Sequence, residues 1–282
     1  MVVMSDVHLG SPASRAEDAC EFLAGLTCEH LVLNGDIIDG WQLRRGAMWT
    51  DRATRYARLV LSMLERGTRV TYLRGNHDEF LSRALPLSVA GLEVVEELIL
   101  HTPAGPYVVV HGDAFDALIR RGGVLEWVAD QGYGKLLWLN RQMNRVRRWS
   151  GRDDFSLAAA VKSRVGSAVA YVERFEKSVC DMARLRGCVG AITGHIHVAG
   201  DKVIDGVHYL NSGDWVESCT ALLQGPGGGP FELVRYQPVR FRAGATAGDA
   251  EPSWRAAGQL RERQRAVVPG EFEPAGVEAV SV

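Results

Sequence analysis

The sequence predicts an α/β fold in which polar side chains gather at one edge of a sheet. Short apolar runs typical of buried strands alternate with amphipathic segments of helical period in the first part of the chain. Six apolar runs are followed at once by clusters rich in Asp, Asn and His, namely Ser5–His8, Asn34–Asp39, Gly75–Asp78, His111–Asp113, Gly194–His197 and Asn211–Asp214. Parallel strands end at the same edge of a sheet, so we expect these clusters to meet there.

The first elements follow a strand, helix, strand, helix, strand order. The apolar run Val2–Met4 predicts the first strand, and the spacing of Cys20, Phe22, Leu23 and Leu26 predicts a helix after it. Leu31–Leu33 is the next strand. An amphipathic helix is expected from about Thr50 to a stop at Gly67, before the strand Val70–Leu73.

The second half of the chain contains further strands and a helical insertion. We expect strands at 107–110, 188–192, 207–210 and 231–236, some of them antiparallel. Two helical regions, 124–149 and 156–186, interrupt this pattern, and the last half of the second is expected to pack on the sheet. We therefore predict a domain over 1–245 with a helical cap at about 115–165. The composition of 246–282 predicts a disordered tail.

Composition excludes several classes of function. The chain has 282 residues, of which 46% are hydrophobic, and its net charge of -2 gives no general attraction to nucleic acid. Five cysteines without Cys-x-x-Cys spacing suggest neither a disulfide framework nor a thiolate zinc site. No run of about 18 apolar residues and no signal-peptide pattern occurs, so we expect a cytoplasmic protein.

The polar clusters together predict a metal site. A single Asp-x-His or Gly-Asp is most often ordinary loop polarity or helix capping, so neither motif alone is specific. The joint set offers carboxylates, imidazoles and an amide oxygen but no thiolate. Such ligands suit two divalent ions, for which we expect Mn²⁺, with Fe or Zn as alternatives.

The ordered series of motifs resembles that of the calcineurin-like metallophosphoesterases over about 1–214. Asp-x-His, Gly-Asp-x-x-Asp, Gly-Asn-His-Asp, a later His and Gly-His-x-His are all present. The resemblance implies an αββα sandwich and a binuclear centre that cleaves phosphoesters by metal-activated hydroxide. It also implies the ligands of both metals, with Asp36 bridging: Asp6, His8, Asp36 and His197 for one, and Asp36, Asn76, His111 and His195 for the other.

Two further residues are given catalytic roles. We expect His77 to protonate the leaving oxygen or stabilise the transition state, and Asp78 to fix its tautomer. The alternative is that His77 only orients Asn76. Asp39 and Asp113 are expected to support ligands or loops, while the other histidines are read as surface or strand-flank residues: His30, His101 and His208.

The motifs narrow the class of substrate. Serine/threonine phosphatases of this superfamily have arginine directly after the second Asp of Gly-Asp-x-x-Asp, whereas Gly40 follows Asp39 here. The stretches 35–41 and 211–218, with the insertion after His111, are instead similar to UDP-2,3-diacylglucosamine diphosphatases of lipid A biosynthesis and their relatives. The well-known members have arginine where this chain has His77, so another lipid-linked or nucleotide phosphoester fits equally well.

The insertion supplies an independent argument for contact with lipid. Its aromatic and aliphatic residues, Trp127, Trp138 and Trp149 among them, alternate with arginines such as Arg141 and Arg145. Basic and aromatic residues together are typical of a helix at a membrane surface, although an amphipathic helix packed on the core would share the pattern. We therefore expect peripheral contact with the anionic inner face of the cell membrane.

Two competing functions remain open at this stage. The first is a phosphodiesterase for soluble nucleotides or another phospholipid-type substrate. The second is a non-catalytic scaffold, which is less favoured because every ligand of the motif series is retained.

Overall fold

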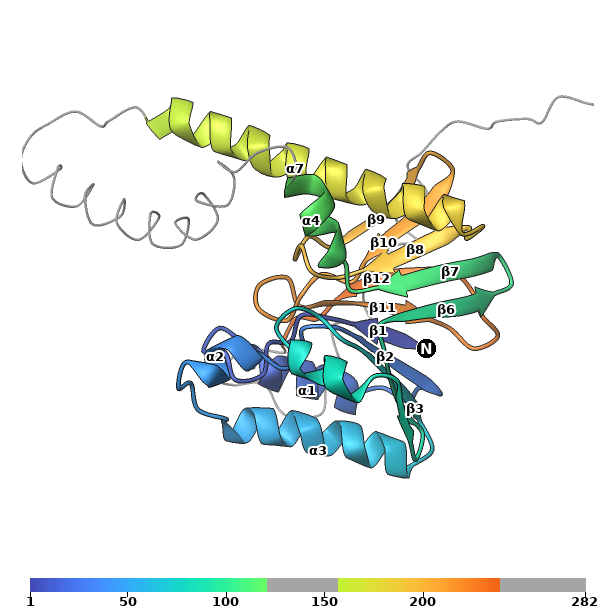
Figure 1. Cartoon of the computed structure of the whole chain (residues 1–282). Helices are drawn as coiled ribbons and strands as arrows, with labels where there is room; N and C mark the ends of the chain where they lie inside the picture. Colours follow the sequence, from blue (N-terminus) through green and yellow to red (C-terminus); the bar gives the residue numbers. More distant parts are fainter. Residues whose placement is uncertain (121–156, 239–282) are drawn as a thin grey trace, which may run out of the picture.

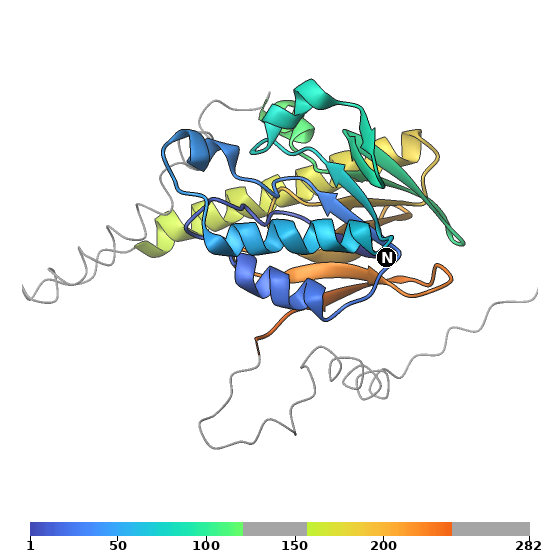
Figure 2. The same cartoon turned by 90° about the horizontal axis from the view of Figure 1, so that it is seen from below.

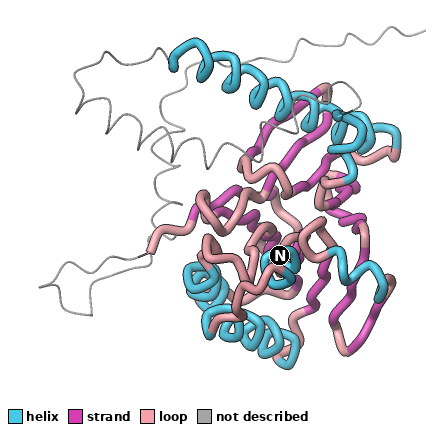
Figure 3. Tube along the Cα trace, turned by 60° about the vertical axis from the view of Figure 1, so that its left-hand side comes forward, coloured by secondary structure: helices cyan, strands magenta, loops and turns pink. Residues whose placement is uncertain are grey.

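The computed structural model describes residues 1–120 and 157–238 and confirms the αββα architecture. Two sheets lie face to face, and helices cover both outer sides (Figure 1). In Figure 3 the strands occupy the middle of the molecule and helices flank them on two sides. Most of the cap predicted at about 115–165 lies outside the described residues, because 121–156 are not described, and the predicted tail 246–282 lies outside them entirely. Both remain predictions.

The first sheet has seven strands and a parallel centre. The register Val3 to Val32 and Val32 to Thr71 brings the carboxyl ends of its first three strands level. In order of pairing the strands are β12 (Phe231–Arg235), β11 (Thr220–Gln224), β1 (Val2–Met4), β2 (His30–Asn34), β3 (Arg69–Leu73), β5 (Leu92–Val95) and β4 (Leu87–Val89).

The second sheet has five strands. Strands β7, β8 and β10 run parallel, while both edge strands are antiparallel to their neighbours. In order of pairing they are β6 (Glu97–Thr102), β7 (Gly105–Val110), β8 (Gly190–Thr193), β10 (Val207–Asn211) and β9 (Gly200–Ile204).

Helices bury their apolar faces against the outer sides of the sheets. Helices α1 (Ala16–Ala24) and α3 (Asp51–Glu65) cover the first sheet, and α7 (Leu157–Leu185) crosses the second, as Figures 1 and 2 show. The α3 helix begins where the Thr50 side chain accepts a hydrogen bond from Ala53 N. The shorter helices are α2 (Gly40–Arg44), α4 (Ala114–Arg120) and the 3₁₀ helix η1 (Glu79–Ala84).

The predicted packing of the second half of α7 is confirmed. Phe175, Val179 and Ala183 are fully buried and repeat every four residues, so they form one face toward the second sheet. Within the described residues, no helix combines the length and the apolar composition that a membrane span requires.

The central strands are buried on both faces. Val3 of β1 packs between the two sheets, whereas its neighbours Val2 and Met4 pack under the helices of the first sheet. This double burial explains why the central strands appear in the sequence as continuous apolar runs. It also fixes the strand ends rigidly, which positions the loops that follow them.

Candidate metal centre

The polar clusters lie together at the carboxyl ends of the strands. Asp6 and His8 follow β1, and the loop is tied to the one after β2 because His8 N donates to Asp36 O at 2.9 Å. Within the second sheet Gly194 N donates to His111 O at 3.1 Å, and between the sheets His195 N donates to Asp6 Oδ2 at 3.0 Å. The edge predicted from the sequence therefore exists and joins both sheets.

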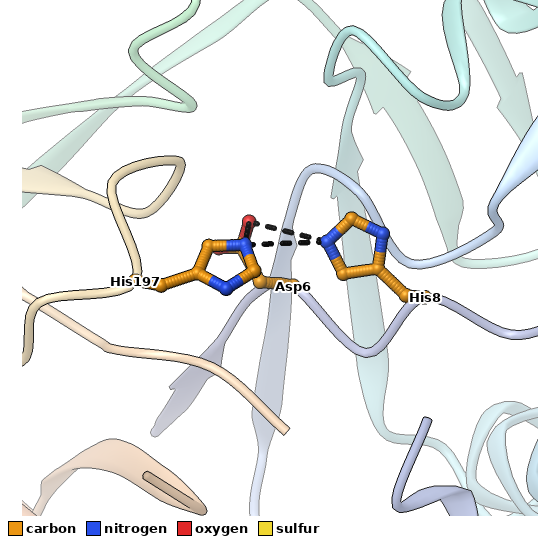
Figure 4. Close-up of side chains that lie close together, drawn as sticks. All are labelled: Asp6, His8 and His197. Carbon is orange, nitrogen blue, oxygen red and sulfur yellow. Dashed lines mark hydrogen bonds and ion pairs between the residues drawn. The ribbon is translucent and has the colours of Figure 1, made fainter. Parts of the chain in front are cut away.

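The first group of side chains comprises Asp6, His8 and His197. His197 Nε2 lies 3.1 Å from Asp6 Oδ1, and His8 Nε2 lies 3.3 Å from His197 Nε2. Figure 4 shows the two imidazoles turned toward each other beside the carboxylate. Two ring nitrogens and one carboxylate oxygen directed at a common point can hold one cation.

The second group is centred on Asp36. Its Oδ2 lies 3.3 Å from His111 Nε2, and His195 completes the group. The same carboxylate oxygen lies 3.9 Å from His8 Nε2, a member of the first group. Asp36 therefore stands between both groups, in the position predicted for the bridging ligand.

The carboxylates of Asp6 and Asp36 each accept a backbone hydrogen bond with one oxygen, and the other oxygen faces the centre. Asp6 Oδ2 accepts a hydrogen bond from His195 N at 3.0 Å, and Asp36 Oδ1 accepts one from His77 N at 2.8 Å. These bonds fix the orientation of the two carboxylates. Asp6 Oδ1 is buried and has no hydrogen-bond partner among the described residues.

Buried atoms without partners indicate that the residues fit a metal centre. Besides Asp6 Oδ1, the buried Asn76 Oδ1 and His111 Nε2 form no hydrogen bond within 1–120 and 157–238. His111 Nδ1 donates to Asn34 O at 2.9 Å, so Nε2 is the ring nitrogen that can bind a metal once its proton is released. An uncompensated buried polar atom is costly, and a cation would compensate all three.

Backbone strain is concentrated in the same residues. Asp6, His8, Asp36, His195 and His197 all have φ between 53° and 67°, a region that residues other than glycine rarely adopt. Such conformations persist only where the surroundings enforce them, and they cluster at functional sites.

Two glycines of the motifs are required by close approach. A Cβ at Gly75 would lie 2.2 Å from Asp36 Oδ1, and one at Gly194 would lie 2.6 Å from Asp6 Oδ2. The glycines before Asn76 and His195 thus leave room for the carboxylates of Asp36 and Asp6.

The buried carboxylates of the centre raise the pKa values of the imidazoles beside them. Burial alone lowers the pKa of His8, but contacts with Asp39 and Asp6 raise it to about 10. Burial likewise disfavours charge on His111, while the Asp36 carboxylate raises the pKa of His111 to about 10. Without a metal, protonated imidazoles therefore balance the buried carboxylates.

The predicted partner of His77 is wrong. His77 Nδ1 lies 3.0 Å from Asp39 Oδ1 and donates to it. Asp78 instead accepts hydrogen bonds from Gly75 N, Ile37 N and the Tyr72 hydroxyl. Asp78 thus shapes the loop that carries His77, and Asp39 orients the ring. Asp39 Oδ2 also lies 3.6 Å from His8 Nδ1, so one carboxylate orients two imidazoles.

The other polar residues of the clusters form hydrogen bonds and ion pairs that hold the loops in place. Asp113 forms an ion pair with Arg74 at 3.0 Å. Asn211 Nδ2 donates to Gly194 O, which positions the loop of His195, and Asp214 Oδ1 accepts hydrogen bonds from the backbone of 216–218.

Three histidines lie outside the polar clusters, and the structure agrees only in part with the positions predicted for them. His101 is exposed, but His30 is buried at 4% exposure between Thr71 and Arg69. The surface alternative is therefore wrong for His30, whereas the strand-flank alternative agrees with its place at the start of β2. His208 lies between Tyr107 and Asp201 on the second sheet.

Two contacts of the centre were missed by the sequence analysis. His195 Nε2 lies 3.1 Å from Asp116 Oδ1 of α4, and Trp41 of α2 packs on His77 with ring centroids 4.1 Å apart. A single Asp in a helix gives no signal of its own. Trp41 directly follows Gly-Asp-x-x-Asp-Gly, and its position two residues after Asp39 is the signal for a contact with the centre.

Comparison with known proteins agrees with this geometry. The family profile described as Calcineurin-like phosphoesterase (Metallophos) matches residues 1–199. No sequence among curated proteins matches significantly.

Several solved structures are similar to the chain at low sequence identity. An archaeal phosphodiesterase has a TM-score of 0.40 at 13% identity, with 83% of this chain and 98% of that chain covered. The phosphoesterase YfcE from E. coli has a TM-score of 0.39 at 14% identity, with coverages of 80% and 87%. For Vps29 from Entamoeba histolytica the values are 0.40, 13%, 84% and 98%. On the family match, this chain belongs to the calcineurin-like phosphoesterases.

Proposed function

We propose that the protein is a binuclear-metal hydrolase that cleaves a phosphoester or pyrophosphate bond. The observation that carries the proposal is the position of Asp36, whose Oδ2 faces His111 at 3.3 Å and His8 at 3.9 Å. A carboxylate shared by two ligand groups suits two neighbouring cations.

The chain offers a ligand set for each of the two ions. Asp6, His8, Asp36 and His197 would hold one, and Asp36, Asn76, His111 and His195 the other. Bound divalent ions, for which we favour Mn²⁺, would lower the pKa of water and neutralise phosphoryl charge.

His77 is suited to act on the leaving group. Its side chain is 22% exposed, so a substrate can reach it, and its Nε2 lies 4.0 Å from Asp36 Oδ2. Since Nδ1 is held by Asp39, the proton that His77 can give or take is the one at Nε2. The Asp39 carboxylate would stabilise the protonated ring.

For the substrate we propose a lipid-linked sugar nucleotide, as in the UDP-2,3-diacylglucosamine diphosphatases. The sequence of 35–41 and the basic-aromatic composition of the predicted cap support this proposal. Peripheral contact with an anionic membrane would accompany it. A soluble nucleotide phosphodiester is the second candidate, because His77 stands where the lipid enzymes have arginine.

A hydrolysis screen with Mn²⁺ tests class and substrate together. UDP-diacylglucosamine in mixed micelles would be compared with UDP-sugars and bis(p-nitrophenyl) phosphate, and the cleaved bond identified by mass spectrometry. We expect cleavage of the pyrophosphate in the lipid substrate and binding to anionic vesicles. Rapid cleavage of small diesters with neither of these results would favour the soluble substrate. No turnover with an empty centre under manganese-replete conditions would reopen the scaffold function.

A further inference from the structure

The short helix α2 is attached directly to the candidate acid His77. Asp39 Oδ1 accepts hydrogen bonds from Gln42 N at 2.9 Å, which caps the helix, and from His77 Nδ1 at 3.0 Å. In addition, Gly40 N donates to His77 O at 3.0 Å. Side chains on α2 are therefore held at a fixed position relative to the centre.

Trp41 is the first aromatic side chain of this helix and forms the wall beside His77. The two ring centroids are 4.1 Å apart with planes inclined by 32°. Trp41 is nevertheless 40% exposed, so part of its indole is open to solvent next to a catalytic residue. Such a ring can stack on a second planar group.

Two arginines follow Trp41 at helical spacing. Arg44 is the last residue of α2 and Arg45 is its C-cap; they come three and four residues after Trp41 and so lie near the same side of the helix. Both are exposed, and neither forms an ion pair with any residue that the structure describes. The three side chains border a shallow surface depression of about 370 Å³ that is widely open to solvent.

We propose that Trp41, Arg44 and Arg45 bind the nucleoside diphosphate portion of the substrate, an inference that rests on the proposed hydrolase function. The base stacks on the open part of the Trp41 indole, and the phosphate that is not attacked lies between the arginines. The planar guanidinium matches phosphate oxygens in a bidentate manner, and two unpaired cations complement the charge of a pyrophosphate. The reacting phosphate lies at the centre beside His77.

A purely structural role for these residues is the competing explanation. Basic side chains near a helix C-terminus stabilise its dipole, and Trp41 would serve only to hold the His77 ring. Under that explanation, loss of Trp41 would affect every phosphate ligand equally. The proposal predicts instead that each substitution affects one part of the ligand.

Binding to the manganese-loaded full chain separates these possibilities. Isothermal titration calorimetry would compare UDP, pyrophosphate and inorganic phosphate on the parent protein, on Trp41→Ala and on the double variant Arg44→Ala/Arg45→Ala. We expect Trp41→Ala to weaken UDP at least about tenfold and pyrophosphate less than about twofold. The double variant should weaken both UDP and pyrophosphate about tenfold and spare phosphate.

Matched substitutions elsewhere control for general damage. Trp49→Ala removes an indole of similar exposure, 41%, and Arg66→Ala removes an exposed arginine near the start of β3, at the opposite edge of the sheet. Both controls should bind all three ligands like the parent. Trp41→Phe, which retains a ring, should recover part of the affinity for UDP.

The outcomes test the nucleotide-binding site and the hydrolase function separately. Unchanged UDP affinity in the variants, or an equal loss of affinity for inorganic phosphate, would contradict the proposed binding site without contradicting the proposed hydrolase function. If the variants lost binding to phosphatidylglycerol vesicles while their UDP affinity stayed unchanged, the surface would be a membrane contact. That result would also contradict the proposed nucleotide-binding site. If the ligand pattern holds but no phosphoester is turned over, the proposed function fails and the binding site stands.

Discussion

Asp39 Oδ1 lies 3.0 Å from His77 Nδ1, although the two residues are 38 positions apart in the chain. Burial alone raises the pKa of Asp39, but the hydrogen bond from His77 and the nearby His8 ring more than offset this effect, so the pKa is lowered. The carboxylate is therefore charged at neutral pH. It can hold the His77 ring with Nε2 directed toward the centre.

Replacing Asp39 with Asn should impair catalysis more than metal binding. The amide cannot stabilise a protonated His77, and we expect kcat to fall about 10- to 100-fold. At saturating Mn²⁺, metal content measured by plasma mass spectrometry should stay near that of the parent, because Asp39 supports the ligand His8 without being a ligand itself. A kcat unchanged within twofold would remove Asp39 from the mechanism.

The Asp78→Asn variant is the matched comparison. Asp78 accepts hydrogen bonds from two backbone amides and from the Tyr72 hydroxyl. In the variant an amide NH₂ replaces one of these accepting oxygens and faces groups that themselves donate. We expect the free energy of unfolding in urea to fall by about 2 kcal/mol. If Asp78→Asn lowered kcat with stability preserved, the sequence-based role of Asp78 would be restored.

Adding one methyl group at Gly75 should displace the shared carboxylate. The new Cβ would lie 2.2 Å from Asp36 Oδ1, while the backbone of Gly75 needs no left-handed conformation. Gly75→Ala should therefore lose metal and most activity, with stability lowered by about 1 to 3 kcal/mol. Gly225→Ala, where no atom lies within 4 Å of the added Cβ, is the control and should behave like the parent.

Much of the centre could be predicted because each motif follows a central strand. Val2–Met4, His30–Asn34 and Arg69–Leu73 are neighbours in one parallel register, so a motif at the end of each must meet the others. The edge strands were missed for the opposite reason. Glu97–Thr102 and Gly200–Ile204 are partly exposed and contain polar residues, so they lack a continuous apolar run.

The partner of His77 could not be predicted from spacing. Asp39 and Asp78 both closely follow a residue of the centre, and Asp78 is adjacent to His77 in sequence. Adjacent side chains in a loop diverge, and here Asp78 turns back to Gly75 N. Asp39 reaches His77 because it also caps α2, a short helix that the sequence did not predict.

Removing the shared ligand tests the assignment of two metals. Asp36→Ala should lose most turnover and bind fewer than two Mn²⁺ ions per chain, since the variant lacks an oxygen that faces both groups. Circular dichroism should show an intact fold. Near-normal turnover with full metal content would contradict the site.

Metal binding should release protons. His8 and His111 have pKa values raised to about 10 in the metal-free protein, so both rings are protonated near pH 7.5. A metal takes the lone pair at the ring nitrogen, and we expect about two protons released per chain and an affinity that rises with pH. Calorimetry of Mn²⁺ binding in buffers of different ionisation enthalpy counts these protons. Release that does not decrease in His8→Asn would contradict the expectation.

The buried His30 should make stability depend on pH without any metal. Arg69 donates to His30 Nδ1 at 3.1 Å, so the neutral ring carries its proton on Nε2 toward Thr71. Burial and the charge of Arg69 lower the pKa of His30 from 6.5 to about 4. Between these values the unfolded chain binds the extra proton and the folded chain does not. Stability must therefore fall as pH falls from 6.5 to 4.

From those two values the His30 contribution to the loss is about 2 kcal/mol between pH 7 and pH 5. Urea unfolding in EDTA at both pH values, on the parent and on His30→Gln, measures it as a difference between variants. His30→Gln should show a pH dependence smaller by that amount, and His101→Gln controls for the loss of a histidine from an exposed strand position. Because Gln cannot take up a proton, an equal pH dependence in His30→Gln and the parent would show that folding does not change the pKa of His30, which would contradict the prediction.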